Sequence, residues 1–330
     1  EAQAYSFNRE WKDELIDGGL KQDTRGNELI PNQIECTDWI SRGFDDSEGE
    51  YQEGFYYYFA KGKNEIVLEN GDIAFAVESL RVFNTEPAGS YASLKPSEAQ
   101  LAAAQAEGYF YKVQGETTLK KSDMVLYPIY DRSSPDVEEV DPMRIIRNTI
   151  GGENWSTPLQ YIIWKIEVPA DGYYKIGVRY RQNFVKNLFV TRKVYIDDQQ
   201  AYAEMDQFEF NYCDVFQNYV LNDGNEDMLF YLTAGTHELK MEVTLGSLAE
   251  QLRVIESALR RLNEMYRKII MVTGVEPDLL RDYNLDSEIP ELSATFNAMS
   301  ASLRDQYRIF ESLTQKAGSE AKILEEIAYQ

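Results

Sequence analysis

The 330-residue sequence predicts a mainly β protein with an α-helical C-terminal part: an antiparallel, jelly-roll β-sandwich followed by a helical bundle. Residues 160–181 read as two strands around a turn, because Ile162, Trp164 and Ile166 alternate with polar residues. Further short alternating runs carry turn signals, which favours an antiparallel sandwich over a parallel α/β sheet. After Gly246 the apolar spacing changes to alternating steps of four and three residues, which is typical of packed helices.

The composition excludes some classes of partner. The chain has 33 basic and 56 acidic residues, a net charge of −23, so we expect neither nucleic acid nor anionic membrane to bind it. Cys36 and Cys213 have neither metal-site nor disulfide-framework spacing. No apolar run is long enough to span a bilayer, so direct membrane insertion is not expected. Without an initial Met or a signal peptide, the chain reads as a processed piece of a longer protein.

Residues 1–86 are predicted to form a partial β-sandwich unit. Residues 1–53 are polar and rich in turn formers, which favours ordered loops with one or two strands. A strand–turn–strand is expected over 54–69 and another strand over 73–83. Two hairpins with glycine turns can look alike by chance, but the ungapped match of 58–69 to 231–242 favours an internal repeat. The matching pairs are Tyr58 with Tyr231, Gly62 with Gly235, Glu65 with Glu238 and Glu69 with Glu242.

A linker with a short helix, residues 87–108, leads into the central unit. Ser97 and Gln100 have the spacing of a capping box, and Gly108 is the expected stop. The central sandwich is predicted over 109–246. Its expected elements are a first strand at 109–116, a polar excursion at 123–154, the central pair at 160–181, a strand at 192–198 and a closing hairpin at 228–243.

Residues 247–330 are predicted to be helical. Pro290 fits the first turn of a second helix, Gly318 breaks that helix, and Ser319 caps a third. An antiparallel bundle or hairpin is favoured over a stripe that awaits a separate partner. The expected stripes are Leu248, Leu252, Ile255, Leu259, Leu262, Tyr266 and Ile269 in the first helix, Leu292, Phe296, Met299, Leu303, Tyr307 and Phe310 in the second, and Ile323, Leu324 and Ile327 in the third.

Three motifs give the central unit a resemblance to carbohydrate-binding module families six and thirty-five. They are the Val-Pro-Ala-Asp-Gly-Tyr-Tyr turn at 168–174, the Tyr-Ile-Asp-Asp turn at 195–198 and the closing hairpin at 232–239. The resemblance implies a β-sandwich and carbohydrate as the ligand class. Modules of these families usually open with a Glu-x-Glu that holds a structural calcium. Here the motif is Gln114-Gly-Glu116, and one carboxylate fewer weakens a calcium site. No cofactor is therefore predicted.

A second resemblance covers most of the chain. Residues 11–27, 147–155, 160–164, 179–183, 266–274 and 281–283 are similar to the long N-terminal region of certain extracellular solute-binding proteins of bacterial ABC sugar importers. In that family such sandwiches and helices precede a two-lobed substrate-binding domain, which has no counterpart here. The resemblance implies an extracellular or cell-surface location, with anchoring through another part of the parent protein. It also implies a downstream solute-binding domain and an ABC permease as partners.

The candidate ligand-binding residues gather around two features. Trp155 follows two glycines in a loop where an exposed ring could stack on a sugar, with Tyr130, Asp131, Arg132 and Asn148 near the same end. The alternative is that Trp155 closes the edge of the core and that Arg132 pairs with a carboxylate. The second feature is one face of a predicted strand, which carries Arg179 and Arg181. Their planar hydrogen-bond donors suit sugar hydroxyls or the carboxylate of a uronate. Ion pairing with the protein's carboxylates is the alternative reading of both arginines.

Nothing in the sequence indicates catalysis. It contains no glycine-rich phosphate loop, no histidine-based metal cluster and no nucleophile motif, so an enzyme is not expected. The leading function is carbohydrate recognition or presentation within a sugar importer. A structural spacer or protein-docking region is the second possibility, and an accessory module of a polysaccharide-degrading enzyme is the third. An exposed aromatic ring beside a polar cleft would favour recognition over a spacer.

Overall fold

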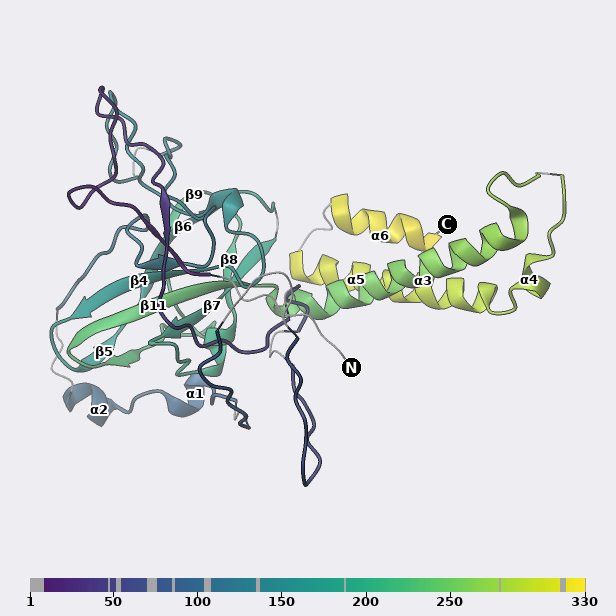
Figure 1. Ribbon diagram of the computed structural model, residues 1–330, viewed down its shortest axis with the longest axis horizontal. Coiled ribbons are helices and arrows are strands. Elements are labelled where there is room, and N and C mark those ends of the chain that lie inside the picture. Colours follow the sequence, from purple (N-terminus) through teal and green to yellow (C-terminus); the bar gives the residue numbers. More distant parts are fainter. Residues whose placement is uncertain are drawn as a thin grey trace.

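A computed structural model describes most of the chain and confirms the predicted fold class. An antiparallel, β-sheet-rich part carries a helical part that extends to one side (Figure 1). The described residues are 9–46, 48–51, 55–69, 76–84, 87–103, 108–134, 137–186, 188–278, 280–314 and 319–329.

The first layer of the sandwich is a seven-stranded antiparallel sheet with the order β2-β1-β3-β4-β11-β7-β8. The long strands β4 and β11 lie at its centre, and Gly235 to Glu242 of β11 pair residue by residue with Val168 to Tyr161 of β4. The bounds are β1 Trp11–Asp13, β2 Gln33–Glu35, β3 Lys120–Lys121, β4 Tyr161–Val168, β7 Phe189–Ile196, β8 Phe208–Asn211 and β11 Gly235–Thr244.

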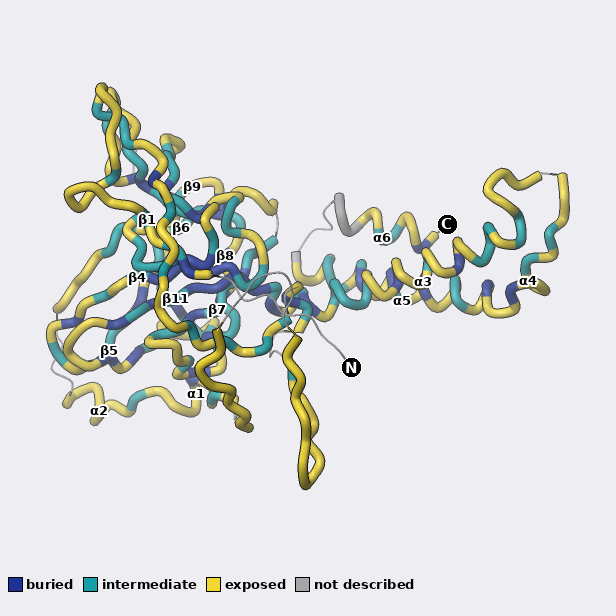
Figure 2. The backbone as a smooth tube through the Cα atoms, viewed as in Figure 1, coloured by how far each residue is buried: buried dark blue, intermediate teal, exposed yellow. Residues whose placement is uncertain are grey.

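Two strand pairs form the second layer. β5 (Gly172–Tyr174) pairs with β10 (Phe230–Leu232), and β6 (Gly177–Gln182) pairs with β9 (Cys213–Val220). One core cluster joins both layers, because it contains Val194 and Met241 of the first and Phe230 of the second. Trp164 and Ile166 pack against this cluster, as their alternation predicted. The buried backbone accordingly follows the central strands (Figure 2).

The N-terminal residues join the first layer of the central sandwich, although the sequence predicted a separate unit. β1 pairs with β2 and also with β3. The segment around β1 and β2 also covers Tyr161, whose hydroxyl donates to Glu10 at 2.8 Å and whose ring lies 4.2 Å below the Arg42 guanidinium. Glu10, Tyr161 and Glu242 are therefore buried on this side of the sheet. Burial raises the pKa of Glu242 despite nearby cations.

The strands predicted over 54–69 and 73–83 are wrong for the residues that the structure describes there. Residues 55–69 and 76–83 contain no strand, and 55–69 lie in a segment that projects from the body (Figure 1). Tyr58 is 94% exposed. Alternation alone does not make a strand, because the ladder needs a neighbour to accept its hydrogen bonds. Positions 54 and 73–75 lie outside the described residues, so the repeat has no observed second hairpin.

Near the linker, the structure differs from one prediction and agrees with another. The predicted first strand at 109–116 is irregular, and it contacts the sheet through Gly115, whose carbonyl accepts from Trp164 Nε1 at 2.8 Å. The predicted helix exists as α2 (Glu98–Ala103), and Ser97 and Gln100 form its capping box. Before it, α1 (Tyr91–Leu94) inserts Tyr91 into the core. The described residues of the sandwich also form three short 3-10 helices: η1 Gly152–Asn154, η2 Ala203–Asp206 and η3 Gly246–Leu248.

The C-terminal part consists of α3 (Ala249–Thr273), the short α4 (Leu285–Glu288), α5 (Leu292–Thr314) and α6 (Ser319–Tyr329). One cluster joins Ala258 of α3, Leu303 of α5 and Ala328 of α6. The α5 stripe is confirmed over the first half of the helix, since Leu292, Met299 and Leu303 are buried. None of the described helices has a segment long and apolar enough to cross a bilayer.

The stripe predicted for α3 and α6 is partly wrong. Leu259 and Tyr266 are 46% and 59% exposed, whereas Ala258 and Met265, one residue earlier in each case, are buried. A straight helix drifts relative to a strict seven-residue repeat, so the buried face need not follow a regular four-three spacing. On α6, Leu324 packs inward, but Ile323 and Ile327 are exposed.

The sandwich passes into the helices through a tight connection. Only η3 lies between β11 and α3. Gly246 has a φ of +56°, and a Cβ there would lie 2.8 Å from Gln207 and 2.9 Å from Thr191. The Thr191 hydroxyl also donates to the carbonyl of Thr244.

Candidate functional site

Six of the seven predicted site residues lie on or beside the outer face of the β6–β9 pair. Strand alternation places Val178 and Tyr180 against the core, which leaves Arg179 and Arg181 on the opposite face. The loop at 123–154 supplies the others. Those six are Tyr130, Asp131, Arg132, Asn148, Arg179 and Arg181.

Asp131 is the centre of this group. Its carboxylate accepts from Arg181 Nη2 at 2.5 Å, and both side chains are at most 15% exposed. Buried Asn148 holds the loop from the other side, because its Oδ1 accepts the Asp131 N–H and its Nδ2 donates to the carbonyls of Asp131 and Glu139. Burial disfavours the Asp131 carboxylate, but hydrogen bonds from Ser133 and the charge of Arg181 outweigh it, so the pKa of Asp131 is lowered.

The remaining members also have partners. Phe216 of β9 lies 4.8 Å from the Arg181 guanidinium and 5.9 Å from that of Arg179. Arg179 also donates to Asn218 at 3.4 Å. Arg132 lies 5.5 Å from the centre of the Tyr130 ring. The group is thus largely satisfied internally, and its contacts fasten the long loop to the second layer. The ion pair of Arg181 with Asp131 matches the alternative reading of that arginine.

Trp155 packs toward the core. Its ring contacts the main core cluster, meets Trp164 edge to face with centroids 6.1 Å apart, and lies 4.3 Å from the Arg192 guanidinium. Its Nε1 donates to the carbonyl of Gln160 at 3.3 Å. Burial lowers the pKa of Arg192 to about 10. These contacts match the alternative in which Trp155 closes the edge of the core.

Glu116 is the remaining carboxylate of the motif that holds a structural calcium in the carbohydrate-binding modules. One of its carboxylate oxygens is buried and has no hydrogen-bond partner. Burial, with smaller effects of Glu139 and Glu28, raises its pKa to about 7. Within the described part of the chain, no three His, Cys, Asp or Glu side chains are arranged to hold a metal ion.

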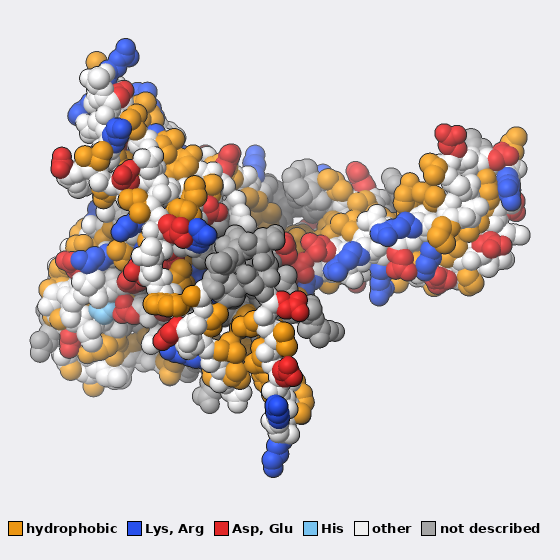
Figure 3. All heavy atoms as spheres, in the orientation of Figure 1, with side chains coloured by type: hydrophobic (Ala, Val, Ile, Leu, Met, Phe, Trp, Pro, Cys, Tyr) orange, Lys and Arg blue, Asp and Glu red, His pale blue; other side chains and the backbone are white. Residues whose placement is uncertain are grey.

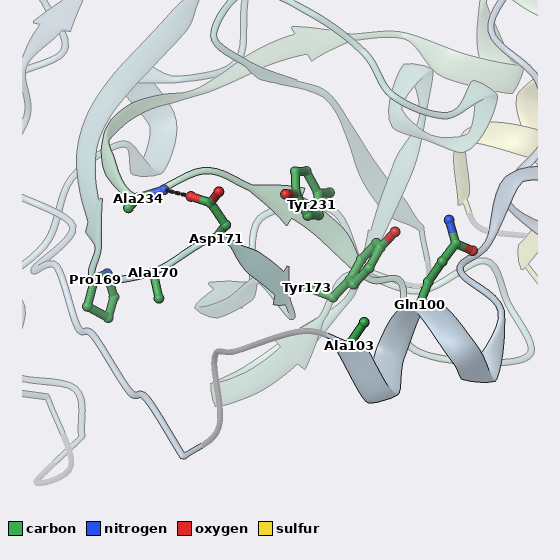
Figure 4. Close-up of a pocket in the computed structure, with 8 residues that line it drawn as sticks. All are labelled: Gln100, Ala103, Pro169, Ala170, Asp171, Tyr173, Tyr231 and Ala234. Carbon is green, nitrogen blue, oxygen red and sulfur yellow. Dashed lines mark hydrogen bonds between the residues drawn. The ribbon is translucent and has the colours of Figure 1, made fainter.

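A pocket of about 810 Å³ opens at the end of the sandwich where two turns meet α2 (Figure 4). The turns are the one between β4 and β5 and the one between β10 and β11. Tyr173 and Tyr231 face each other across the β5–β10 pair, with ring centroids 5.3 Å apart and an interplanar angle of 64°. The lining residues are Gln100, Ala103, Pro169, Ala170, Asp171, Tyr173, Tyr231 and Ala234.

The polar groups of this pocket keep hydrogen-bonding capacity. Asp171 Oδ1 accepts the Ala234 N–H at 2.6 Å, and within the described chain no hydrogen bond reaches Oδ2. Gln100 Oε1 accepts from Ser97, while its Nε2 has no donor contact to a described residue. The Tyr231 side of the pocket is open, since that residue is 55% exposed. An acceptor, a donor and an open aromatic ring therefore line one concave space.

This pocket was not predicted from the sequence. Asp171 and Tyr173 belong to the Val-Pro-Ala-Asp-Gly-Tyr-Tyr turn, which predicted only the hairpin. Gln100 reaches the pocket from a helix 71 positions before Asp171, and no local pattern signals that approach. His237, which follows the turn between β10 and β11, is 8% exposed, with its ring nitrogens 2.6 Å from Asp197 and 2.8 Å from the Thr233 carbonyl.

The wider surface is mixed in charge. On the face shown in Figure 3, Lys and Arg side chains are interspersed with Asp and Glu among the described residues. This face offers no continuous basic surface, in keeping with the net charge of −23.

A protein-family model matches the helical part of the chain. Residues 250–329 match the family described as bacterial solute-binding protein, four-helix bundle domain. No curated protein matches the chain.

Three similar solved structures each cover about two fifths of this chain at low identity. A cycloisomaltooligosaccharide glucanotransferase of Paenibacillus sp., complexed with cycloisomaltoheptaose, is 17% identical with a TM-score of 0.30, over 42% of this chain and 17% of that one. A GH26-CBM35 β-(1,4)-mannanase of Podospora anserina is 13% identical with a TM-score of 0.28, over 41% and 24%. A family 35 carbohydrate-binding module from an environmental isolate is 12% identical with a TM-score of 0.25, over 43% and 80%. TM-scores this low support no argument, so the fold assignment rests on strand pairing and the shared core.

Proposed function

We propose that this chain is a non-catalytic, carbohydrate-binding region of a bacterial solute-binding protein that serves sugar import, and that it acts outside the cell. The observation that carries the proposal is the pocket at Tyr173 and Tyr231. It combines an open aromatic ring with an unused carboxylate oxygen of Asp171 and an unused amide donor of Gln100. A sugar presents an apolar ring face and hydroxyls that both donate and accept, so it can use all three groups.

The family match supports the identity of the parent protein. Residues 250–329 resemble the helical bundle of bacterial solute-binding proteins, and this segment follows the sandwich through η3 alone. In our proposal the sandwich holds a glycan while the helices connect it to a downstream substrate-binding domain, which delivers sugar to a permease in the membrane.

The test is a binding screen of the intact chain on a glycan array, followed by calorimetry of each hit. Tyr231→Ala should abolish a hit and leave the melting temperature nearly unchanged, because the residue is 55% exposed. Tyr58→Ala is the matched control, since it removes a tyrosine that is 94% exposed on the projecting segment. A hit that survives Tyr231→Ala, or the absence of any hit, would remove the support for this function.

A structural spacer is the second candidate, and one observation favours it. The residues predicted to bind sugar are fastened to one another through Asp131, Arg181 and Asn148. A spacer requires only such internal contacts and a stiff connection to the helices. If the screen finds no glycan, a pull-down of the purified substrate-binding domain of the same parent protein by the intact chain would test the spacer directly.

A further inference from the structure

The charge around the Tyr173–Tyr231 pocket limits the class of sugar that it can hold. Among its described lining residues, Asp171 is the one ionisable acid, and no lysine, arginine or histidine is present. The closest basic residue in sequence to the pocket tyrosines is Lys175, which is already paired with Asp227 at 2.7 Å. An anionic ligand would therefore meet a carboxylate without a compensating cation.

Acidic sugars are normally bound through guanidinium or ammonium groups, because a carboxylate pairs with the planar donors of arginine or with lysine. The pocket has neither group. The net charge of −23 adds a long-range repulsion of anions. A uronate or a phosphorylated sugar would lose its hydration shell on entry and gain no ionic partner.

An uncharged sugar fits the same groups without this cost. Asp171 Oδ2 can only accept a hydrogen bond and Gln100 Nε2 can only donate one, and a pair of hydroxyls can serve both. A cationic amino sugar could pair its ammonium with Asp171 and offer a hydroxyl to Gln100, so the charge of Asp171 disfavours acidic sugars specifically. The exposed ring of Tyr231 can cover the apolar face of the sugar.

We propose, on the basis of the proposed function above, that this pocket takes a sugar unit without an acidic group and that Asp171 provides the selection against acidic sugars. Asp171 acts here both as a hydroxyl acceptor and as a repulsive charge. Selectivity commonly combines one attractive and one repulsive element of this kind.

The experiment uses matched pairs of probes with the intact chain. The methyl glycosides of glucose, mannose and galactose are compared with the corresponding methyl uronides, and methyl glucosaminide is included. Affinities are measured by saturation-transfer NMR titration, which detects weak ligands. At least one neutral glycoside should bind about tenfold or more tightly than its uronide, because like charges close together in a partly buried site repel strongly.

Two variants test the role of charge. Asp171→Asn keeps the shape and an oxygen for the Ala234 N–H, and it should reduce the ratio between neutral and acidic probes toward one. Ala103→Lys adds a cation to the pocket wall from exposed α2 and should favour the uronide. Thermal melts establish that each variant is folded, and the second variant keeps the test open if the first is not.

The outcomes separate this inference from the proposed function. Binding of a uronide in preference to its neutral glycoside would overturn the inference but leave sugar binding in place, whereas both the neutral glycosides and the amino sugar should bind more tightly than the uronides. An unchanged ratio in both folded variants would also overturn it. Failure of every probe, together with an empty glycan array, would overturn the proposed function itself.

Discussion

Replacing Asp13 with alanine should destabilise the sandwich by about 3–5 kcal/mol, the usual cost of leaving one member of a buried ion pair without its partner. Asp13 lies on β1, and its Oδ1 is 2.6 Å from Nζ of Lys121 on β3. The Lys121 side chain is fully buried, and that of Asp13 is 7% exposed. Burial lowers the pKa of Lys121 despite its bond to Asp13. Gln33 Nε2 also donates to Asp13 at 2.7 Å, so the substitution affects three strands together.

Urea unfolding monitored by tryptophan fluorescence measures this loss in the intact chain. Asp38→Ala is the control, because Asp38 pairs with the neighbouring Lys120 at 3.1 Å but is 67% exposed, so its loss should cost less than about 1 kcal/mol. The double variant Asp13→Leu with Lys121→Met should recover most of the stability, since an apolar pair can replace a buried ion pair. Equal, small losses for Asp13→Ala and Asp38→Ala would show that β1 does not belong to the central sheet.

Three further predictions concern other parts of the fold. Glu116→Gln should stabilise the protein by up to about 3 kcal/mol above pH 7 and have little effect near pH 4. Urea unfolding at each pH measures this difference, and the exposed Glu153→Gln is the control. The sign follows because the folded-state pKa of Glu116 is raised to about 7, so the folded state loses stability as pH rises from the unfolded value through 7. Trp155→Ala should cost about 3–5 kcal/mol as a core substitution, and an unchanged melting temperature would contradict its place in the core. Leu303→Ala should cost about 2–5 kcal/mol and Leu259→Ala less than about 1, which helical circular dichroism during unfolding would measure; equal losses would contradict the α3–α5 packing.

The parts of the fold that local pattern determines were predictable. The alternation around Trp164 predicted β4, and the change of period after Gly246 marked the helices. The hairpin predicted over 160–181 is wrong, because its second half forms β5 and β6 of the other layer, while β4 pairs with β11 and β3. The α5 stripe was readable because Leu292, Met299 and Leu303 form one face of a single helix.

Features that depend on a neighbour far away in the sequence were not predictable. The pattern over 54–69 resembles a hairpin, but the described residues there have no sheet to join. The place of Asp13 beside Lys121 depends on a strand pairing across 108 positions. Arg181 was predicted to lie on the same strand face as Arg179, yet its ion pair with Asp131 was one of many that the acidic composition allows. The pocket depends on α2 approaching two turns, and no single segment carries that information.

The left-handed Gly246 has a consequence for how force could pass through the molecule. Any larger residue would collide with Thr191 and Gln207, and the hydrogen bond from Thr191 to Thr244 holds the chain immediately before it. The connection between the sheet and α3 is therefore short and packed against the sandwich. A pull on the far end of the helices would act directly on the end of β11, because the element between β11 and α3 is the short η3 and not a long linker.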